Sequence, residues 1–402
     1  MDATVQQLGD VVIEALRAAG YMQSTIGQYE KTIRYLTGFV AERGGGVYTP
    51  ALGAAFAAAT TSSRTGRFSA QRRFDYRRLV TLFDGYLATG VVDLSVRTRG
   101  GGGSLPVSVA FCALDAAWEA DMTERGLAPA TRSAYGRVAR GYLAFLESRG
   151  IDDLAGAGGA SVLAFLESLT DRWAASSLFW VVSSFRPFLR FTTRADLLEA
   201  VGLAGVKRSH RILPVLDDED HARVVHACTA GRVSARDAAI TLLALTTGLR
   251  ACDLVALRLT DIDWRAGTIG IVQQKTGNPL TLPLAPLVIS KLADYVLHGR
   301  PDSGDDHVFL RVKAPHTRLA DHASIYRVTA TTFRVAGVSD VKAGTQLLRH
   351  SAASRLLRAA VPLPTISAVL GHAHEESTNV YLATDDARLL ECVLPVPAGA
   401  RP

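Results

Sequence analysis

Tyr381, in the stretch HEESTNVYL near the carboxyl end, is either a packing residue or a nucleophile. A phenol has a pKa of about 10, so at neutral pH it needs a cationic surround or a proton acceptor before it can attack. A lone tyrosine is almost always a packing residue. The choice therefore depends on the basic side chains that the rest of the chain places around it.

Two arginines lie in helical stretches. Arg250 interrupts the apolar stretch TTGLRACDL, and Arg349 lies in QLLRHS on a helix with an apolar face. A charge among apolar residues is costly unless it is paired or reaches a site. The planar fork of a guanidinium suits a phosphate. The competing interpretations are an ion pair of Arg250 with Asp253 and a surface position for Arg349.

Two further basic residues are expected in turns. Lys275 stands where the first strand of a predicted hairpin, GTIGIVQQ–KTGN–PLTLPL, meets its turn. Its ammonium is either solvated or gives a proton to an alkoxide leaving group. His372 follows Gly371 at a helix C-terminus, where the helix dipole favours the charged imidazole. With His374 it forms an HxH pair, which without a third ligand is a weak zinc signal.

The order and spacing of these residues form a stronger signal than any one of them. Arg250 precedes a hairpin lysine by 25 residues, a second arginine follows on a helix, and the tyrosine lies nine positions after the histidine of LGH. The stretches TTGLRACDL, QQKTGN, LLRHSAASRLL and VLGHAHEESTNVY closely resemble the tyrosine recombinase (phage integrase) family over about residues 212–395. Residues 107–208 are similar to that family's helical core-binding domain.

The resemblance implies a mechanism. Tyr381 attacks a DNA phosphodiester, forms a 3′-phosphotyrosyl bond and releases a 5′-hydroxyl, and a second strand's hydroxyl reverses the step. Arg250 and Arg349 stabilise the charge on the phosphate oxygens, His372 bonds a nonbridging oxygen, and Lys275 protonates the leaving 5′-oxygen. The covalent link stores the phosphodiester energy and the cations replace a metal, so no cofactor and no metal ion are expected.

One position departs from the family pattern. The family usually has histidine, sometimes lysine, three residues before the second arginine, where this chain has Gln346. Glutamine can bond a substrate phosphate but cannot accept a proton or carry charge. We expect reduced rather than absent activity, and we expect Gln346→His to raise the cleavage rate.

The elements that must position these residues are expected to be mainly helical, with a small antiparallel hairpin in the catalytic domain. The resemblance implies a DNA breaking–rejoining fold preceded by helical core-binding units. The glycine-rich stretch TRGGGGSLP is the clearest linker. The expected parts are an N-terminal helical DNA-binding unit (1–98), the linker (99–106), a core-binding helical domain (107–208) and a catalytic domain with a C-terminal tail (212–402).

The two N-terminal parts look alike. Residues 20–44 and 126–150 share seven identical residues at a constant offset of 106, including a glycine at each end. Each copy is typical of an amphipathic helix ended by glycine, and each is followed by an aromatic-rich helix. This favours two helical units of related design, by duplication or convergence, over chance similarity of amphipathic helices.

Basic residues outside the catalytic part are candidates for DNA contacts. The net charge of +6 is compatible with a polyanionic partner, and residues 64–78 have six arginines against one aspartate. The alternative is a solvated basic face. Phe74 and Leu79 are expected to face inward from this helix. The residues expected to contact phosphates are Arg72, Arg73, Arg77, Lys207 and Arg208.

We therefore expect a cytoplasmic, nucleoid-associated enzyme that acts on double-stranded DNA as a homotetramer, alone or with related recombinases, in an integrase or transposon-borne role. No stretch has the length and apolar character of a membrane span, and no CxxC pair is present. The apolar tail 385–402 is expected to dock on a neighbouring subunit. Three alternatives stay open: a DNA-binding regulator with an impaired site, a type IB topoisomerase-like enzyme, and a metal-dependent nuclease using DDED, 217–220, itself expected to cap a helix.

Overall fold

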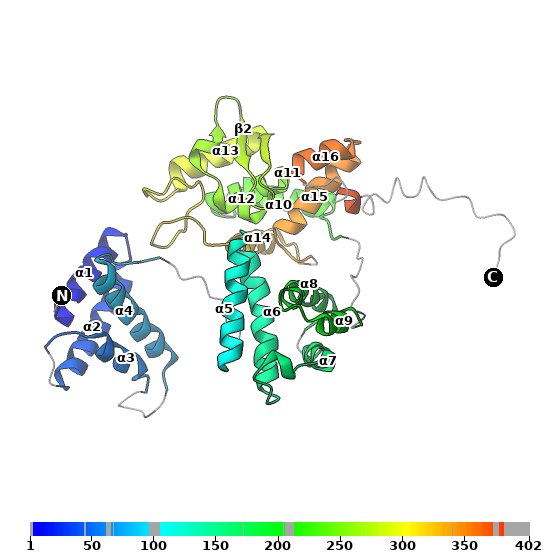
Figure 1. Ribbon diagram of the computed structural model, residues 1–402. Coiled ribbons are helices and arrows are strands. Elements are labelled where there is room, and N and C mark those ends of the chain that lie inside the picture. The colour runs from blue at the N-terminus through cyan, green and yellow to red at the C-terminus, as the bar shows by residue number, and fades with distance from the viewer. Residues whose placement is uncertain are drawn as a thin grey trace. The chain divides into compact units, whose positions relative to one another are not determined.

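The computed structural model describes residues 3–43, 46–61, 66, 68–95, 105–171, 173–203, 205, 213–339, 341–372 and 378–381. It is mostly helical with one three-stranded antiparallel sheet, so the predicted fold class is confirmed (Figure 1). Lys207, Arg208 and the tail 385–402 lie outside the described residues. None of the helices in the described part combines the length and apolar character that a membrane crossing requires.

The first helical unit surrounds its own apolar core. Its helices are α1 (Val5–Ala18), α2 (Gln23–Ala41), α3 (Pro50–Ala58) and α4 (Ala70–Thr89). Thr4 caps α1 by accepting a bond from the Gln7 backbone, and Gln7 bonds back to Thr4, so both ends of a capping box are made. Leu8, Leu36 and Phe83 are buried in the centre.

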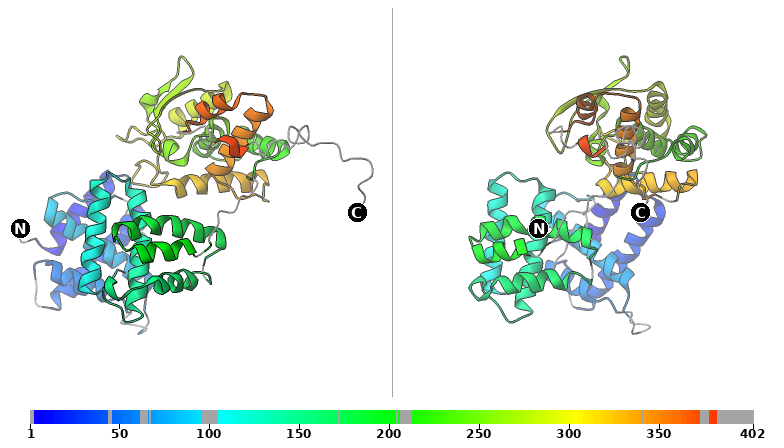
Figure 2. Two further views of the ribbon diagram at one scale, coloured as in Figure 1. Left: turned by 45° about the vertical axis from the view of Figure 1, so that its right-hand side comes forward. Right: turned by 90° about the vertical axis from the view of Figure 1, so that its right-hand side faces the viewer.

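The second unit, residues 97–211, has an aromatic core. Its helices are α5 (Val109–Glu124), α6 (Pro129–Glu147), α7 (Gly159–Ser168), α8 (Ala175–Phe191) and α9 (Ala195–Leu203). α5 and α6 lie side by side in every view (Figures 1 and 2). The helices share one core, in which four aromatic side chains are fully buried: Trp118, Tyr142, Phe185 and Phe188.

The two units repeat local structure at the offset seen in the sequence. α2 begins and ends 106 residues before α6. The turns that precede these helices contain Gly20 and Gly126 with φ of 74° and 67°. In each turn the residue after the glycine donates its backbone N–H to a carbonyl in the preceding helix: Tyr21 to Leu16 at 3.0 Å, and Leu127 to Met122 at 3.1 Å. These left-handed turns require glycine in each copy.

The ends of α2 and α6 also match. The guanidinium of Arg43 lies 3.6 Å from the ring centre of Phe39, and that of Arg149 lies 5.1 Å from the ring centre of Phe145. Both pairs are again 106 residues apart. The prediction of two units of related design is therefore confirmed at the backbone turns and at this side-chain contact.

The C-terminal part is built around one apolar helix. α11 (Ala235–Thr247) packs against α10 (Asp218–Thr229), α13 (Pro286–Asp294), α14 (His322–Ala336) and α15 (Thr345–Arg358). A helix that is apolar on nearly all sides is typical of a core position. Because α11 ends at Gly248, the residues that follow it emerge close to the centre of this part.

Shorter elements complete the C-terminal part. α12 (Ala251–Ala256) follows α11, α16 (Leu363–Leu370) packs against α15, and residues 378–381 form a single 3₁₀ turn. The 3₁₀ helix η2 (Leu259–Asp261) and the π-helix η3 (Tyr295–Gly299) also belong to this part, whereas the 3₁₀ helix η1 (Leu154–Gly156) belongs to the second unit.

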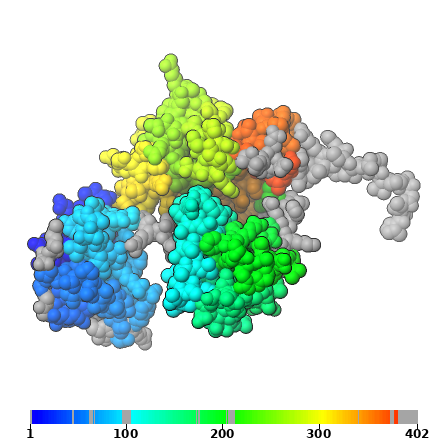
Figure 3. All heavy atoms as spheres, viewed as in Figure 1, coloured from blue at the N-terminus to red at the C-terminus, as the bar shows by residue number. Residues whose placement is uncertain are grey.

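The sheet has the order β1–β2–β3 and is antiparallel throughout. Its strands are β1 (Ile262–Asp263), β2 (Thr268–Val272) and β3 (Pro279–Pro283). Ile269 pairs with Leu282, and both side chains are buried against the core. The predicted hairpin is confirmed, and the turn between β2 and β3 projects from the surface (Figure 3).

Candidate active site around Tyr381

Arg250 is positioned by the end of the buried helix α11. Gly248 ends that helix with φ of 65°, and a Cβ there would lie 2.8 Å from Leu370 Cδ2, so the turn accepts only glycine without rearrangement. Arg250 is the N-cap residue of α12, and its Nη1 donates to Gln273 Oε1 at 2.9 Å. The guanidinium is therefore held by a neutral amide.

The alternative ion pair is not the contact that Arg250 makes. Asp253 is 2% exposed, and its Oδ1 accepts the backbone N–H of Gln274 at 2.8 Å. That bond ties the start of α12 to the β2–β3 turn. The carboxylate thus fixes the hairpin beside Arg250, while the guanidinium bonds Gln273.

Arg349 is buried, so its interpretation as a surface arginine is wrong. Its side chain lies on α15, with the residue 7% exposed. Nη1 donates to the Gly248 carbonyl at 2.9 Å, and Nη2 donates to the Leu370 carbonyl at 2.8 Å. Burial, with the nearby Arg250 charge, lowers the pKa of Arg349 to about 10. It therefore remains a cation at neutral pH, fixed by two backbone acceptors.

Gln273, which was not among the residues predicted from the sequence, joins the two arginines. It is 1% exposed, and its Nε2 donates to the Leu370 carbonyl at 3.0 Å, the same oxygen that Arg349 uses. Gly371 has φ of 61°, and a Cβ there would lie 2.3 Å from Gln273 Oε1. The available signal was weak: a polar residue at the end of an alternating strand, two residues before Lys275.

His372 is neutral at pH 7, which corrects the expectation from the helix dipole. Its Nδ1 lies 2.7 Å from Thr378 Oγ1. Burial, together with the charges of Arg349 and Arg250, lowers the pKa of His372 to about 4. Two guanidiniums and a low dielectric outweigh the partial charge at the end of α16.

Tyr381 is both packed and in contact with the arginines. Its residue is 3% exposed and belongs to an apolar cluster with Leu357, Ile366 and Leu370. The hydroxyl is hydrogen-bonded to the Arg349 side chain. Burial raises the pKa of Tyr381, and the charges of Arg349 and Arg250 oppose that rise. The phenol is therefore protonated at neutral pH, with its oxygen directed at a guanidinium.

Rings flank Tyr381 on two sides. The His372 ring is stacked on it with centroids 6.2 Å apart and planes at 11°. The His350 ring meets it edge to face, with centroids 5.6 Å apart and planes at 65°. Arg250, Arg349, His372 and Tyr381, four of the predicted catalytic residues, are thus brought together from distant segments.

Two other predicted residues lie at the surface. Lys275 is exposed in the β2–β3 turn, as predicted, and Gln346 is exposed in the first turn of α15. Gln346 is therefore placed three residues before the buried Arg349 on the same helix face.

The basic face of α4 differs from prediction at one aromatic residue. Leu79 is fully buried, as expected, but Phe74 is 67% exposed, so its predicted inward position is wrong. The buried stripe of α4 runs through Tyr76, Leu79 and Phe83, and Phe74 lies on the opposite side of the helix.

The arginines of that helix have different surroundings. Arg72 donates to the Thr61 carbonyl at 3.1 Å, and the Arg73 guanidinium lies 5.3 Å from the ring centre of Phe68. Arg73 and Arg77 are exposed one turn apart. Arg72 therefore has a local structural partner, whereas Arg73 and Arg77 form the exposed basic face.

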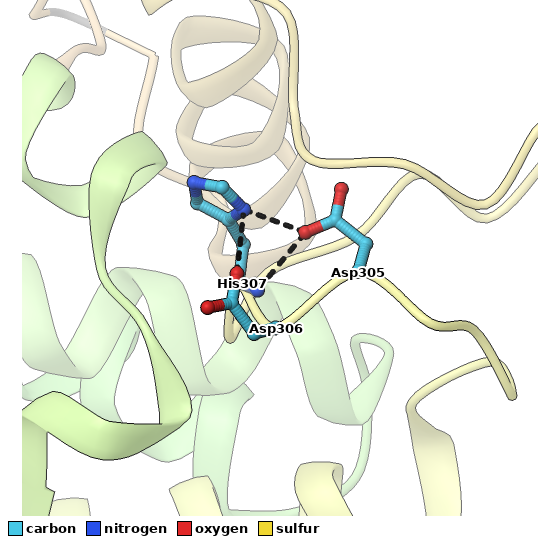
Figure 4. A group of neighbouring side chains, drawn as sticks. All are labelled: Asp305, Asp306 and His307. Carbon is cyan, nitrogen blue, oxygen red and sulfur yellow. Dashed lines mark hydrogen bonds and ion pairs between the residues drawn. The ribbon is translucent and has the colours of Figure 1, made fainter.

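A second group of ionisable residues is structural. Figure 4 shows Asp305, Asp306 and His307 together. Asp305 Oδ1 lies 2.6 Å from His307 Nδ1, and its Oδ2 accepts the Arg318 N–H at 2.9 Å. Arg258 Nη1 donates to Asp306 Oδ2 at 2.5 Å. Burial raises the pKa of Asp305, but the hydrogen bonds of Asp305 with His307 and Arg318 outweigh that rise, and its pKa is lowered. The group fastens a loop through bonds to protein atoms.

The acidic stretch 217–220 caps a helix, as predicted. Asp217 is the N-cap of α10, and its Oδ1 accepts the Asp220 N–H at 2.7 Å. Its neighbours in the first turn face the positive end of the helix dipole.

Comparisons with known proteins agree with the geometry. The phage integrase family model matches residues 214–388. Tyrosine recombinase XerC of Mesorhizobium japonicum is 31% identical over 285 residues, which cover 67% of this chain and 89% of the relative. The chain belongs to the phage integrase family. It is a tyrosine-type site-specific recombinase, an enzyme that cleaves and rejoins DNA.

Other relatives and solved structures extend this likeness along the chain. Tyrosine recombinase XerD of Mycobacterium tuberculosis is 29% identical, with 69% of this chain and 94% of the relative covered. XerH bound to palindromic difH in a post-cleavage complex has a TM-score of 0.57 at 15% identity, covering 85% of this chain and 92% of that one. A lambda integrase tetramer bound to a Holliday junction has a TM-score of 0.53 at 18% identity, covering 80% and 90%. These two structures show the recombinase fold.

The lowered pKa of His372 predicts a pH-dependent stability. Between about pH 6.5 and pH 4 the unfolded chain binds a proton at this histidine that the folded chain does not, so the free energy of unfolding falls as the pH falls. His372→Gln should make that fall shallower in urea unfolding measured at several pH values. The matched control is the exposed His298, 74% exposed at its side chain, for which His298→Gln should leave the slope unchanged. Equal slopes for all three proteins would contradict the assignment.

Proposed function

We propose that this recombinase cuts double-stranded DNA through a 3′-phosphotyrosyl bond on Tyr381, with Arg250 and Arg349 as the charge-stabilising residues. The observation that carries the proposal is the hydrogen bond between the Tyr381 hydroxyl and the side chain of the buried Arg349, with the partly buried Arg250 beside them. Attack by the phenolic oxygen breaks the bond from phosphorus to the 5′-oxygen. The arginines stabilise the negative charge that gathers on the other phosphate oxygens.

The arginines are preorganised for this role. Backbone carbonyls hold Arg349 through one N–H on each terminal nitrogen, and Gln273 holds Arg250 through one N–H. A guanidinium has further donors beyond these, arranged in a rigid fork that matches phosphate. Little reorganisation is then needed when a phosphate arrives, which is how fixed charges lower a barrier most effectively.

His372 acts as a neutral donor in this proposal. When Nδ1 accepts from the Thr378 hydroxyl, Nε2 carries the proton and donates it to a nonbridging phosphate oxygen. Lys275, from the exposed turn, protonates the 5′-oxygen as it leaves. Gln346, exposed on α15, contacts the substrate phosphate without taking a proton.

The similarity to solved recombinase structures also supports a proposal for how the protein assembles on DNA. A homotetramer, alone or with related recombinases, holds two duplexes, and support comes from the lambda integrase tetramer bound to a Holliday junction. The Tn1549 transposon integrase, with a TM-score of 0.55 at 14% identity and coverage of 70% and 99%, supports a role in a mobile element. The first helical unit, which repeats the design of the second, supplies an additional DNA contact through Arg73 and Arg77.

Tyr381→Phe tests the catalytic assignment. With nicked suicide substrates made from DNA flanking the native locus, the wild type should form a covalent protein–DNA complex on denaturing gels and Tyr381→Phe should form none. The control Tyr326→Phe changes a tyrosine that is 41% exposed in the same part of the chain, and should retain the complex. An adduct that persists in Tyr381→Phe would refute the assignment.

Three further measurements distinguish a recombinase from the three alternative functions. A metal-dependent nuclease loses cleavage in EDTA, a type IB topoisomerase-like enzyme relaxes supercoiled plasmid without a defined site, and a regulator binds without any adduct. We expect an EDTA-resistant adduct confined to a defined site.

The double variant Arg73→Ala/Arg77→Ala tests the basic face of α4. If both guanidiniums contact phosphates, affinity should fall similarly for target and non-target DNA, and the slope of log affinity against log salt should decrease by about 2. Arg17→Ala is the control, because that side chain is 59% exposed on α1 and ion-paired with Glu30. A double variant with the wild-type salt slope would exclude this face from the DNA contact.

A further inference from the structure

His350 is an ionisable residue at the site that the mechanism above does not use. It follows Arg349 on α15, and its ring meets the Tyr381 ring edge to face with centroids 5.6 Å apart. Among the described residues its Nδ1 is buried and has no hydrogen-bond partner. A buried polar atom without a partner destabilises the folded protein, so its presence calls for a reason.

Helix geometry relates His350 to Gln346. The two residues are four apart on α15, so they lie on one face with Cβ atoms about 5–6 Å apart. Gln346 is exposed and cannot accept a proton, whereas His350 is partly buried and in ring contact with the nucleophile. The structure thus places an imidazole one helical turn after the exposed glutamine, toward Tyr381.

The protonation states suit a transfer from Tyr381 to His350. Burial raises the pKa of Tyr381, so the phenol keeps its proton and needs an acceptor. Burial, with the charge of Arg349, lowers the pKa of His350, so its imidazole is neutral at pH 7 and one ring nitrogen has a lone pair. Within the described part of the chain, the other ionisable groups that act on Tyr381 or stack on its ring are Arg250 and the neutral His372.

The charged residues on the helices that pack against α15 do not account for the lowered pKa of His350. α16 has no ionisable side chain. On α11, Arg236 and Asp237 form an ion pair with each other. The ionisable residues of α14 are His322, Tyr326, Arg327 and Arg334. Of the charged groups on these helices and on α15, Arg349 is the one that shifts the pKa of His350.

We propose that His350 is the proton acceptor for Tyr381 in this recombinase. As the phenolic oxygen bonds to phosphorus, its proton passes to a ring nitrogen of His350, while the departing 5′-oxygen takes a proton from Lys275. On rejoining, His350 returns the proton to Tyr381 and the lysine recovers its own, so protons balance over the cycle. This inference deepens the proposed function and rests on Tyr381 as the nucleophile.

Two variants at His350 separate proton transfer from packing. His350→Phe keeps a ring against Tyr381 but has no nitrogen, and His350→Gln keeps a hydrogen-bonding group that cannot take a proton. Both should fold and bind DNA like the wild type, yet form the covalent complex roughly 100-fold more slowly in single-turnover cleavage, the lower end of general-base effects. The wild-type rate should fall as the pH drops below the ordinary pKa of histidine, about 6.5, and both variants should lose that dependence.

A rescue variant completes the test. Gln346→His places an imidazole one turn away, so His350→Phe/Gln346→His should recover most of the lost rate and regain the pH dependence. In the wild-type background Gln346→His should raise the rate much less. Unfolding by urea and binding of uncleaved DNA are measured for every variant, and a rate loss that matches a loss of folded or bound protein counts against the proposal.

The overturning results are distinct from those that overturn the proposed function. Cleavage within about twofold of wild type in His350→Phe, or a wild-type pH profile in His350→Gln, removes His350 from proton transfer while leaving Tyr381 as the nucleophile. An absent adduct in the wild type, or an adduct in Tyr381→Phe, overturns both proposals together.

Discussion

One backbone oxygen organises the candidate site. The Leu370 carbonyl, at the end of α16, accepts a hydrogen bond from Arg349 at 2.8 Å and another from Gln273 at 3.0 Å. Gln273 in turn accepts from Arg250 at 2.9 Å. Three segments far apart in the sequence, the end of α11, the β2–β3 turn and α15, are thereby fixed against the C-terminus of α16. Helix C-termini leave carbonyls without intrahelical partners, and here one of them is used to orient side chains.

This arrangement resolves the conflict between burying a charge and keeping it active. Taking a guanidinium out of water is expensive, and burial lowers the pKa of Arg349 to about 10. Two carbonyls offset part of that cost without neutralising the charge, as a carboxylate would. The glycines at 248 and 371 leave room for Leu370 and Gln273 at distances that a Cβ would forbid. The cation is therefore strongly held and still able to attract an anion, which is what a phosphate site requires.

Residue type and order in the sequence were enough to predict which side chains would lie together. Arg250, Arg349, His372 and Tyr381 fall at family spacings, and the hairpin follows from alternation around a turn. The sequence did not select Gln273 or His350, because a buried hydrogen bond and a ring contact depend on segments far apart in the chain. The neutral state of His372 was also missed, since the helix dipole is a local effect and burial between two guanidiniums is not. Phe74 was misplaced because the aromatic residue was read as core, whereas Tyr76, Leu79 and Phe83 set the buried stripe.

A double-mutant cycle on Arg250 and Gln273 tests most directly whether the Leu370 arrangement positions the arginines. Single-turnover adduct formation would be measured for wild type, Gln273→Ala, Arg250→Ala and the double variant. If Gln273 acts by holding Arg250, the double variant should be no slower than Arg250→Ala alone, so that the whole effect of Gln273→Ala appears as coupling. Rate losses that simply multiply in the double variant would contradict the account, because the two side chains would then act independently.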